Sequence, residues 1–161
     1  IVEALRATSH PGATLDIVGR PGWGVDAAAL AARPGVTLHG YQPTDAVRRL
    51  VEAADALIST AHDEGLGLPL LEAQYAGLPV LAPDRPVFRE VLGEGGVILD
   101  AADPAGAAAT IGAALSGPDW RARFVAAAER NLARWNTTAA QDRATVVALL
   151  QERQALAAQT R

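Results

Sequence analysis

Short strand-like segments alternate with helix-like segments along the whole chain, and this alternation constrains the fold more than any other feature of the sequence. The strand-like segments are apolar runs that stop at glycine, proline or a polar residue, as in 13–18, which Gly19 follows. The segments between them have helical composition and also end at glycine or proline. Repeated strand–helix units with short connections predict an α/β fold, specifically a Rossmann-like doubly wound parallel sheet.

We expect residues 1–161 to form a single domain. The predicted strands are 13–18, 36–39, 55–59, 79–82 and 97–99. The predicted helices are 27–32, 44–54, 68–76, 87–92, 103–115 and two final helices at about 119–134 and 138–158. Residues 1–7 have the apolar spacing of the second half of an amphipathic helix, so we expect the first strand of the sheet to lie upstream and to be missing from the chain.

Composition excludes several classes of function. The net charge is −4, which argues against a nucleic-acid-binding protein, since phosphate binding needs a basic face. There is no cysteine, and therefore no disulfide, thiolate metal site or cysteine nucleophile. Arginine is the only basic residue besides histidine, which indicates a GC-rich bacterial genome. No apolar run approaches the ~18 residues of a membrane span.

Polar and glycine-rich segments follow the predicted strands, at the sheet edge where doubly wound folds bind ligands. These segments are 19–24, 40–42, 62–67 and 83–86. In the third of them, Glu64 precedes a glycine-containing turn, and Glu72 lies in the helix that follows. Backbone amides at the turn and the helix N-terminus favour an anion such as a pyrophosphate, whereas the carboxylates can accept hydrogen bonds from vicinal hydroxyls. The pattern predicts a site for a phosphorylated, polyhydroxylated ligand such as a nucleotide sugar.

Residues 62–91 (HDEGLGLPLLEAQYAGLPVLAPDRPVFREV) resemble the donor-binding, carboxy-terminal half of retaining glycosyltransferases of the GT-B fold. These are the group 1 glycosyl transferases of the Glu-x7-Glu type, whose usual pattern is EGFGLPxLEAMAxGxPV. Leu66 stands where phenylalanine is usual, and Gln74-Tyr75 where Met-Ala is usual. Residues 15–23 (LDIVGRPGW) and 36–41 (VTLHGY) resemble mannosyltransferase-like members, and Arg134-Trp135 resembles the family's start of a final helix.

The resemblance implies a role for each matching residue. Glu72 would accept hydrogen bonds from the ribose hydroxyls, and Glu64, as the residue nearest to catalysis, would position the donor sugar without attacking it. The remaining donor contacts would come from Gly65, Leu66, Gly67 and Leu68 (sugar and diphosphate), Gly19 and Arg20 (diphosphate), and Tyr41 and Gln42 (nucleobase). The donor would be GDP-mannose or a UDP-hexose, with GRPGW favouring GDP-mannose, and the acceptor a hydroxyl group. No metal and no further cofactor are expected, because amides, a helix dipole and basic side chains would stabilise the leaving diphosphate.

The resemblance also implies that parts of the enzyme lie outside this chain. The acceptor-binding amino-terminal domain and a basic diphosphate-binding turn are missing, so residues 1–161 alone are expected to be inactive, and the last helix would cross back towards the missing domain. Alternatives are a sugar-nucleotide epimerase of the same architecture and a non-catalytic nucleotide-sugar-binding module. We expect a cytoplasmic location, with peripheral contact to the inner membrane face as an alternative for a full-length protein. An unpaired strand at 15–18 predicts self-association.

Several conspicuous residues have a structural reading beside the functional one. Trp23 could stack on a base or anchor its loop by packing. Arg20 could contact phosphate or simply be an exposed loop arginine. His39 ends a strand, where packing or capping is its expected role. The adjacent side chains of His62, Asp63 and Glu64 point in different directions, which argues against a metal site.

Overall fold

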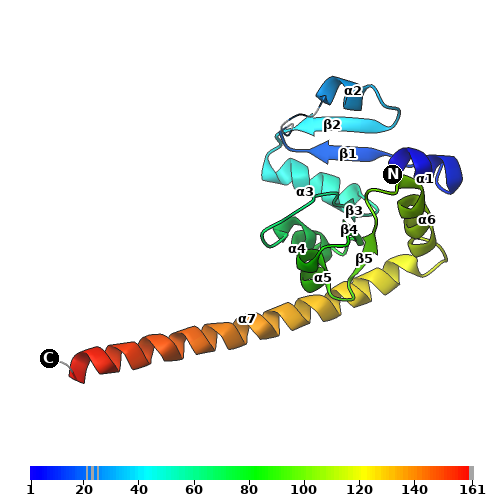
Figure 1. Cartoon of the computed structure of the whole chain (residues 1–161). Coiled ribbons are helices and arrows are strands. Elements are labelled where there is room, and N and C mark those ends of the chain that lie inside the picture. Colours follow the sequence, from blue (N-terminus) through cyan, green and yellow to red (C-terminus); the bar gives the residue numbers. More distant parts are fainter. Residues whose placement is uncertain (21, 23, 25, 160–161) are drawn as a thin grey trace.

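The computed structural model describes residues 1–20, 22, 24 and 26–159, so Trp23 lies outside the described residues. Helices and strands alternate along the chain (Figure 1), and the α/β fold class with parallel strands is as predicted. The strands are β1 (Leu15–Val18), β2 (Val36–Gly40), β3 (Leu57–Ile58), β4 (Val80–Pro83) and β5 (Gly96–Leu99). The helices are α1 (Val2–Thr8), α2 (Ala27–Ala31), α3 (Thr44–Ala53), α4 (Leu68–Tyr75), α5 (Pro86–Leu92), α6 (Pro104–Ala114) and α7 (Trp120–Gln159).

Strand β4 is the centre of a three-stranded parallel sheet in the order β3–β4–β5. All four of its residues are buried, as expected for a parallel strand with neighbours on both sides and helices on both faces. Leu81 pairs with Ile58 of β3 and with Val97 of β5. This continuous apolar strand is the most buried element of the molecule.

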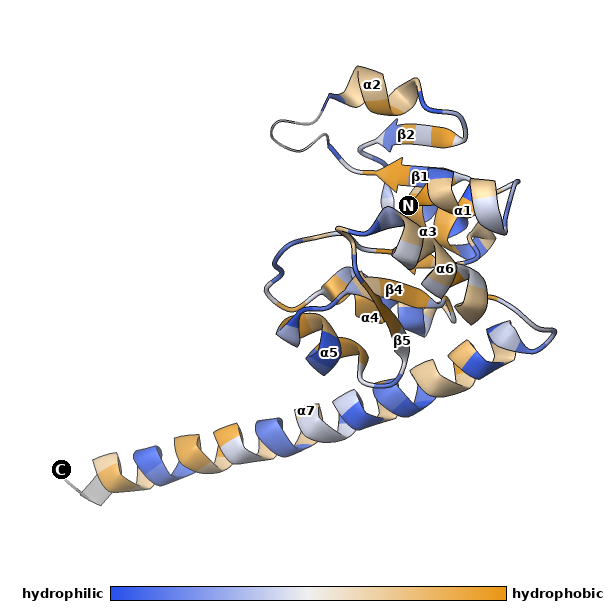
Figure 2. Ribbon diagram, turned by 45° about the vertical axis from the view of Figure 1, so that its right-hand side comes forward, coloured by the Kyte–Doolittle hydropathy of each residue, from blue (hydrophilic) through white to orange (hydrophobic). Residues whose placement is uncertain are grey.

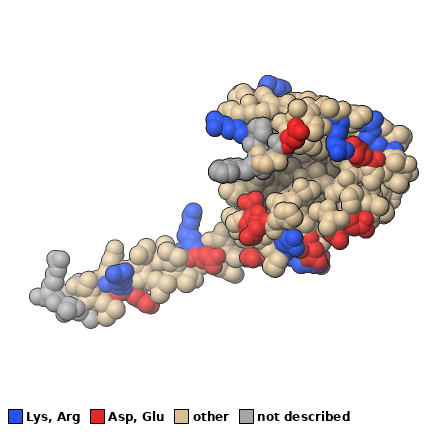
Figure 3. Space-filling model, turned by 45° about the horizontal axis from the view of Figure 1, so that its top comes forward, with Lys and Arg blue, Asp and Glu red and all other residues tan. Residues whose placement is uncertain are grey.

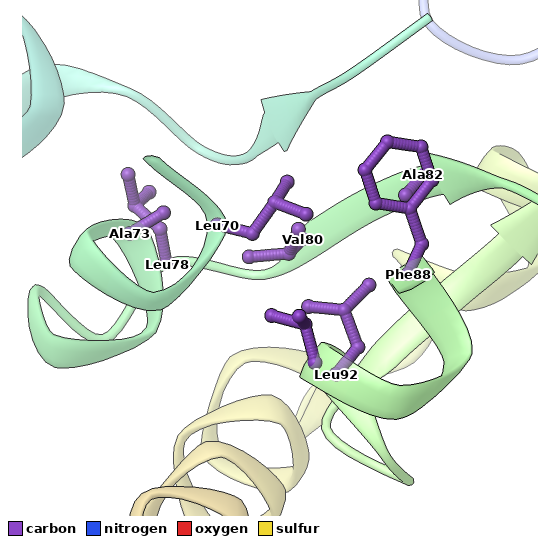
Figure 4. Packing of buried hydrophobic residues seen from close by; sticks show 8 residues of the cluster. Leu70, Ala73, Leu78, Val80, Ala82, Phe88 and Leu92 are labelled. Atoms are coloured by element: carbon purple, nitrogen blue, oxygen red, sulfur yellow. The ribbon is translucent and has the colours of Figure 1, made fainter. Parts of the chain in front are cut away.

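Alternate residues of β4 pack into two separate hydrophobic clusters. Val80 and Ala82 pack with α4 and α5 on one face, in the cluster shown in Figure 4, where Leu70, Phe88 and Leu92 surround them. Leu81 points to the other face. The second cluster consists of Leu5, Leu81, Leu99, Ala107, Ala108 and Ile111. The two clusters therefore place α4 and α5 on one side of the sheet and α1 and α6 on the other.

Strands β1 and β2 form a second parallel sheet, whereas the sequence predicts a single sheet. In the described part of the chain β1 pairs only with β2, and β3 pairs only with β4. Both strands are only partly buried, and Val18 is 39% exposed. The expectation that the first strand lies upstream of the chain stays a prediction.

The two helices predicted at about 119–134 and 138–158 are one continuous helix, α7, so that prediction is wrong. No glycine or proline occurs within α7. The hydroxyls of Thr137 and Thr138 donate to the carbonyls of Ala133 and Arg134, one turn earlier, so these residues fit a helix without interrupting it.

The second half of α7 projects beyond the rest of the molecule (Figures 1 and 2). Every residue from 139 to 157 is exposed. Apolar and polar residues alternate along this projecting half (Figure 2). Its exposed large apolar residues are Val146, Val147, Leu149, Leu150 and Leu156.

Smaller corrections concern element ends. Strand β3 has two residues where 55–59 was predicted, because it pairs on one side only and Asp55 instead forms an ion pair with Arg121 of α7. Helix α3 begins at Thr44 as predicted, with Pro43 in the N-cap position, and ends at Ala53. Asp103 does cap α6, since its carboxylate accepts from the Gly106 amide at 3.0 Å.

Candidate functional site

The segment from 59 to 67 links β3 to α4 and carries Glu64. Gly67 is the N-cap of α4 and has φ 69° and ψ 42°, in the left-handed region that favours glycine. A Cβ atom at this position would also lie 3.0 Å from Cδ1 of Leu70. Pro69 in the first turn fixes the direction of the helix that follows. The local sequence thus turns the chain sharply from the loop into α4, with Glu64 just before the turn.

The amides of residues 65–68 lie at the turn into α4, where residues 65, 66 and 68 are exposed and Gly67 is buried. Within the part of the chain that the structure describes, none of these four N–H groups donates a hydrogen bond to the protein. The first amide of α4 that is satisfied is that of Leu70, which donates to the Gly67 carbonyl at 2.9 Å. Unpaired amides at the positive end of a helix suit an anionic group.

A small depression of about 160 Å³ opens beside this turn. Glu64 and Gly67 line it, together with both residues of β3. Its lining residues are Leu57, Ile58, Ser59, Glu64, Gly67, Pro69, Leu70 and Phe88. Ligand pockets usually measure roughly 300–1,000 Å³, so this depression can hold one part of a nucleotide sugar rather than the whole molecule.

Glu72 is exposed and lies on α4, outside the lining of this depression. Because Glu64 and Glu72 belong to one loop–helix unit, the turn at Gly67 sets their relative position. Leu66 and Leu68 are also exposed, at 46% and 57%. This unit brings together six of the predicted site residues: Glu64, Gly65, Leu66, Gly67, Leu68 and Glu72.

The other four predicted site residues follow β1 and β2, in the second sheet. Gly19 donates its amide to the Gly40 carbonyl at 2.8 Å, which links the ends of the two strands. Arg20 is exposed directly after Gly19, and Tyr41 is 76% exposed. The Gln42 side chain donates to the His39 carbonyl at 2.5 Å. None of the four lines the depression at α4.

His39, for which packing or capping was expected, contacts the side chain of Asp16 instead. Its Nε2 lies 2.7 Å from Oδ1 of Asp16, across the β1–β2 pair. Among the described residues, no three His, Asp or Glu side chains gather as metal ligands would. The absence of a metal from the reaction stays a prediction.

Arg85 is a residue to which the sequence analysis gave no role. It follows β4 and donates from Nε to the His62 carbonyl at 3.0 Å, so it ties the β4–α5 connection to the loop that carries Glu64. Next to it, Asp84 accepts two hydrogen bonds from Arg89, at 2.5 and 2.7 Å. The hydrogen bonds from Arg89, with its positive charge, lower the pKa of Asp84 below its usual range. The feature of the sequence that pointed to Arg85 was its place in residues 83–86, directly after a predicted strand.

The space-filling view shows a hollow between the part of the molecule that contains β1 and β2 and the part that carries α4 and α5 (Figure 3). Uncharged residues form most of its visible surface, and acidic and basic side chains lie along its rim. No helix in the described residues has both the length and the hydropathy of a membrane span.

Comparison with curated proteins gives relatives among bacterial glycosyltransferases. The chain is 36% identical over 118 residues to the D-inositol 3-phosphate glycosyltransferase of Thermobispora bispora, covering 71% of this chain and 28% of that protein. It is 34% identical over 82 residues to the O-antigen chain mannosyltransferase B of Escherichia coli, covering 51% of this chain and 22% of that protein. The chain thus spans only about a third or less of the length of these relatives.

Several solved structures share the fold, and one of them is a glycosyltransferase. WaaG, a glycosyltransferase involved in lipopolysaccharide biosynthesis, aligns with a TM-score of 0.60 and 26% identity over 81% of this chain and 36% of that chain. Alr3699/HepE from Anabaena, solved with UDP and glucose, aligns with a TM-score of 0.65 and 19% identity over 89% of this chain and 43% of that chain. The second likeness shows the fold alone.

The family model for glycosyl transferases group 1 matches residues 1–131, which include both sheets, the turn at Gly67 and both glutamates. Together with the relatives and the GT-B fold, this match shows that the chain belongs to the glycosyl transferases group 1 family.

Proposed function

We propose that this chain is the carboxy-terminal, donor-binding domain of a retaining glycosyltransferase of the Glu-x7-Glu type. The longer protein would transfer a hexosyl group from a nucleotide-diphosphate sugar to a hydroxyl acceptor. The observation that carries the proposal is the N-terminus of α4, where four unpaired amides lie between two exposed glutamates. Amides suit the diphosphate, and carboxylates suit the hydroxyls of ribose and sugar.

In this proposal the protein acts by positioning and by charge stabilisation. As the bond from the sugar to the diphosphate breaks, negative charge grows on the leaving phosphate oxygen. The amides of residues 65–68 are preorganised to receive that charge, and Arg20 is a candidate for adding a positive charge. Glu64 would orient the sugar for attack by the acceptor hydroxyl from the face that the diphosphate leaves, so the anomeric configuration is retained.

The proposed base and sugar of the donor come from similarity to other proteins. Mannosyltransferases occur among the relatives, and UDP is bound in the related structure of Alr3699/HepE. The sequence preference for GDP-mannose rests on 19–23, part of which lies outside the described residues. GDP-mannose and a UDP-hexose are therefore the two donors that we propose to test, and a cytoplasmic location stays a prediction.

Calorimetric titration of the longer protein with UDP, GDP, UDP-glucose and GDP-mannose tests the binding step. We expect saturable binding of one nucleotide and of its sugar derivative, followed by transfer to an added hydroxyl acceptor with retained anomeric configuration. A protein that interconverts sugar nucleotides without an acceptor would be an epimerase, and one that binds without turnover would be a binding module. Failure to bind any of the four ligands would contradict the proposed site.

A further inference from the structure

A buried polar cluster joins α4 to α7. Gln74 and Asn131 are the buried polar side chains among the described residues, at 2% and 5% exposure. Asn131 donates from Nδ2 to Oε1 of Gln74 at 2.7 Å, and Gln74 donates from Nε2 to the Gly95 carbonyl at 2.9 Å. Hydrogen bonds in such an environment are directional, and each partner is costly to leave unpaired.

The same cluster binds the C-terminal end of α5. The Val91 carbonyl accepts from Nδ2 of Asn131 and from Nε1 of Trp135, each at 2.8 Å. Arg134 donates to the Glu90 carbonyl at 2.6 Å and to Oδ1 of Asn131 at 2.8 Å. One turn of α7 therefore satisfies carbonyls at the end of α5 and also holds the C-terminal end of α4.

The turn between α5 and β5 is shaped to admit these side chains. A Cβ atom on Gly95 would lie 2.5 Å from Nε2 of Gln74, and one on Gly93 would lie 2.9 Å from Oδ1 of Asn131. Gly93 also has φ 51°, in the left-handed region. Glycine at both positions thus leaves room for the two amide side chains.

The two positions where α4 departs from the usual family pattern are the ones that bond to α7. Gln74 stands where methionine is usual and bonds to Asn131. Tyr75 stands where alanine is usual, and its hydroxyl donates to Oδ1 of Asn136 at 3.2 Å. Apolar residues at these positions could pack against α7 but could not form directional bonds with it.

We propose that Gln74 and Asn131 are positioning residues that fix the orientation of α4, and with it Glu72 and the amides at the helix N-terminus. Gln74 lies six residues after Leu68, a distance of about 9 Å along a helix, so a rotation at Gln74 is carried to the ligand end of α4. Apolar packing alone tolerates small rotations of a helix against its neighbour, whereas hydrogen-bonded amide side chains favour a single orientation. The inference rests on the proposed donor site for its functional consequence.

The test replaces the polar pair by an apolar pair of similar size. In Gln74→Met/Asn131→Leu no unpaired amide side chain remains, and methionine is the residue usual in the family at position 74. We expect a lower thermal midpoint than in the wild type, because the carbonyl of buried Gly95 loses its donor. We also expect nucleotide binding weakened by about three- to tenfold, because Glu72 and the amides are no longer held in line. Gln74→Met alone serves as the second variant if the double variant does not fold.

Ile111→Val is the matched control, since it lowers stability in the cluster around α6, away from α4. It should lower the thermal midpoint and leave nucleotide affinity unchanged. A purely structural role for the polar pair predicts the opposite outcome for the double variant, which would then bind nucleotide as tightly as the wild type. That result would overturn the proposal.

A ligand-free measurement separates this inference from the proposed function. Residual dipolar couplings of the backbone amides report the orientation of α4 relative to the sheet. They can be measured in the wild type, in Gln74→Met/Asn131→Leu and in Gln74→Met. Unchanged couplings would overturn the positioning role whatever the protein binds. The two results can also differ. If the variants change the couplings but the wild type binds none of UDP, GDP, UDP-glucose and GDP-mannose, the positioning role is supported and the donor site is contradicted.

Discussion

At the scale of single residues, the two glutamates have different proposed contacts and can therefore be separated. Glu64 lies beside the depression at the turn, and Glu72 lies beyond it on α4. If Glu72 accepts from the ribose, its carboxylate contributes to the binding of every nucleotide. If Glu64 meets only the sugar, it contributes nothing to the binding of free UDP or GDP. A hydrogen bond to a charged group contributes about 1.5–3 kcal/mol, or roughly ten- to hundredfold in affinity.

Glu72→Ala should weaken free nucleotide and nucleotide sugar by similar factors within that range. Glu64→Ala should leave free nucleotide unaffected, weaken the nucleotide sugar, and lower turnover further because the reacting ring is less well oriented. Calorimetry with each ligand as a separate titrant measures both effects. Equal losses of free-nucleotide affinity in the two variants would refute the division of roles, and no loss in either would refute the site.

The pair of Asp84 and Arg89 makes the stability of the folded protein depend on pH. The hydrogen bonds that it accepts from Arg89 lower the pKa of Asp84 in the folded protein below its usual value of 3.8. A lowered folded pKa means that the pair stabilises the folded state above the unfolded pKa and that this contribution is lost as pH falls through the folded pKa. The thermal midpoint of Asp84→Asn should therefore lie below that of the wild type near pH 7, by a small amount because the pair is exposed. The gap should close below about pH 3.8, and a gap that widens in acid would contradict this assignment.

At the scale of elements, α7 divides into a packed half and a projecting half. Ala128 is 2% exposed against the domain, whereas Ala148 lies on the exposed stretch. Each Ala→Gly substitution lowers helix propensity by about 1 kcal/mol. Ala128→Gly should lower the thermal midpoint of the domain by roughly 2–4 °C, but Ala148→Gly should leave it unchanged and only reduce the helical signal in circular dichroism. Equal shifts in the two midpoints would show that α7 unfolds as one unit with the domain.

The elements also show what the sequence could and could not predict. Strand and helix positions were predicted closely, because glycine and proline mark the ends of most elements, as Gly67 and Gly77 do around α4. The predicted break in α7 was wrong because threonine hydroxyls can bond within a helix. The division into two sheets depends on strand pairing, which no local pattern states.

The candidate site also has parts that the sequence predicts and parts that it does not. Its loop–helix unit follows from local sequence, since turn, cap and glutamates are neighbours in the chain. The roles of its residues remain predictions. Gln74 and Asn131 are 57 residues apart, and nothing local to either residue indicates that they meet. Arg85 likewise reaches His62 only through the fold.

At the scale of the whole molecule, the free edges of β1 and β3 are the feature with the clearest consequence. Among the residues that the structure describes, neither edge has a pairing partner, and each carries partly exposed apolar residues, which favours pairing with another chain. We expect residues 1–161 to self-associate at high concentration in light scattering. Val18→Arg should reduce this association, because a charge on the free edge opposes strand pairing. A monomer at every concentration would contradict the prediction.

Val147→Arg is the control for association through α7, since Val147 is 46% exposed on the projecting half. If association occurs through strand edges, this variant should associate as the wild type does. If Val147→Arg abolishes association and Val18→Arg does not, the exposed helix is the contact and the strand edges are not.

The projecting half of α7 also changes how the molecule moves through solution. A helix of 40 residues is about 60 Å long, whereas a compact domain of 161 residues has a radius of gyration of about 15 Å. Such a shape has a high frictional coefficient and tumbles anisotropically. A monomer should then leave a gel-filtration column early, at the volume of a larger globular protein, and sediment more slowly than a sphere of 16.6 kDa. Elution volume alone would mistake this drag for a dimer, so mass has to be measured by a method that is insensitive to shape.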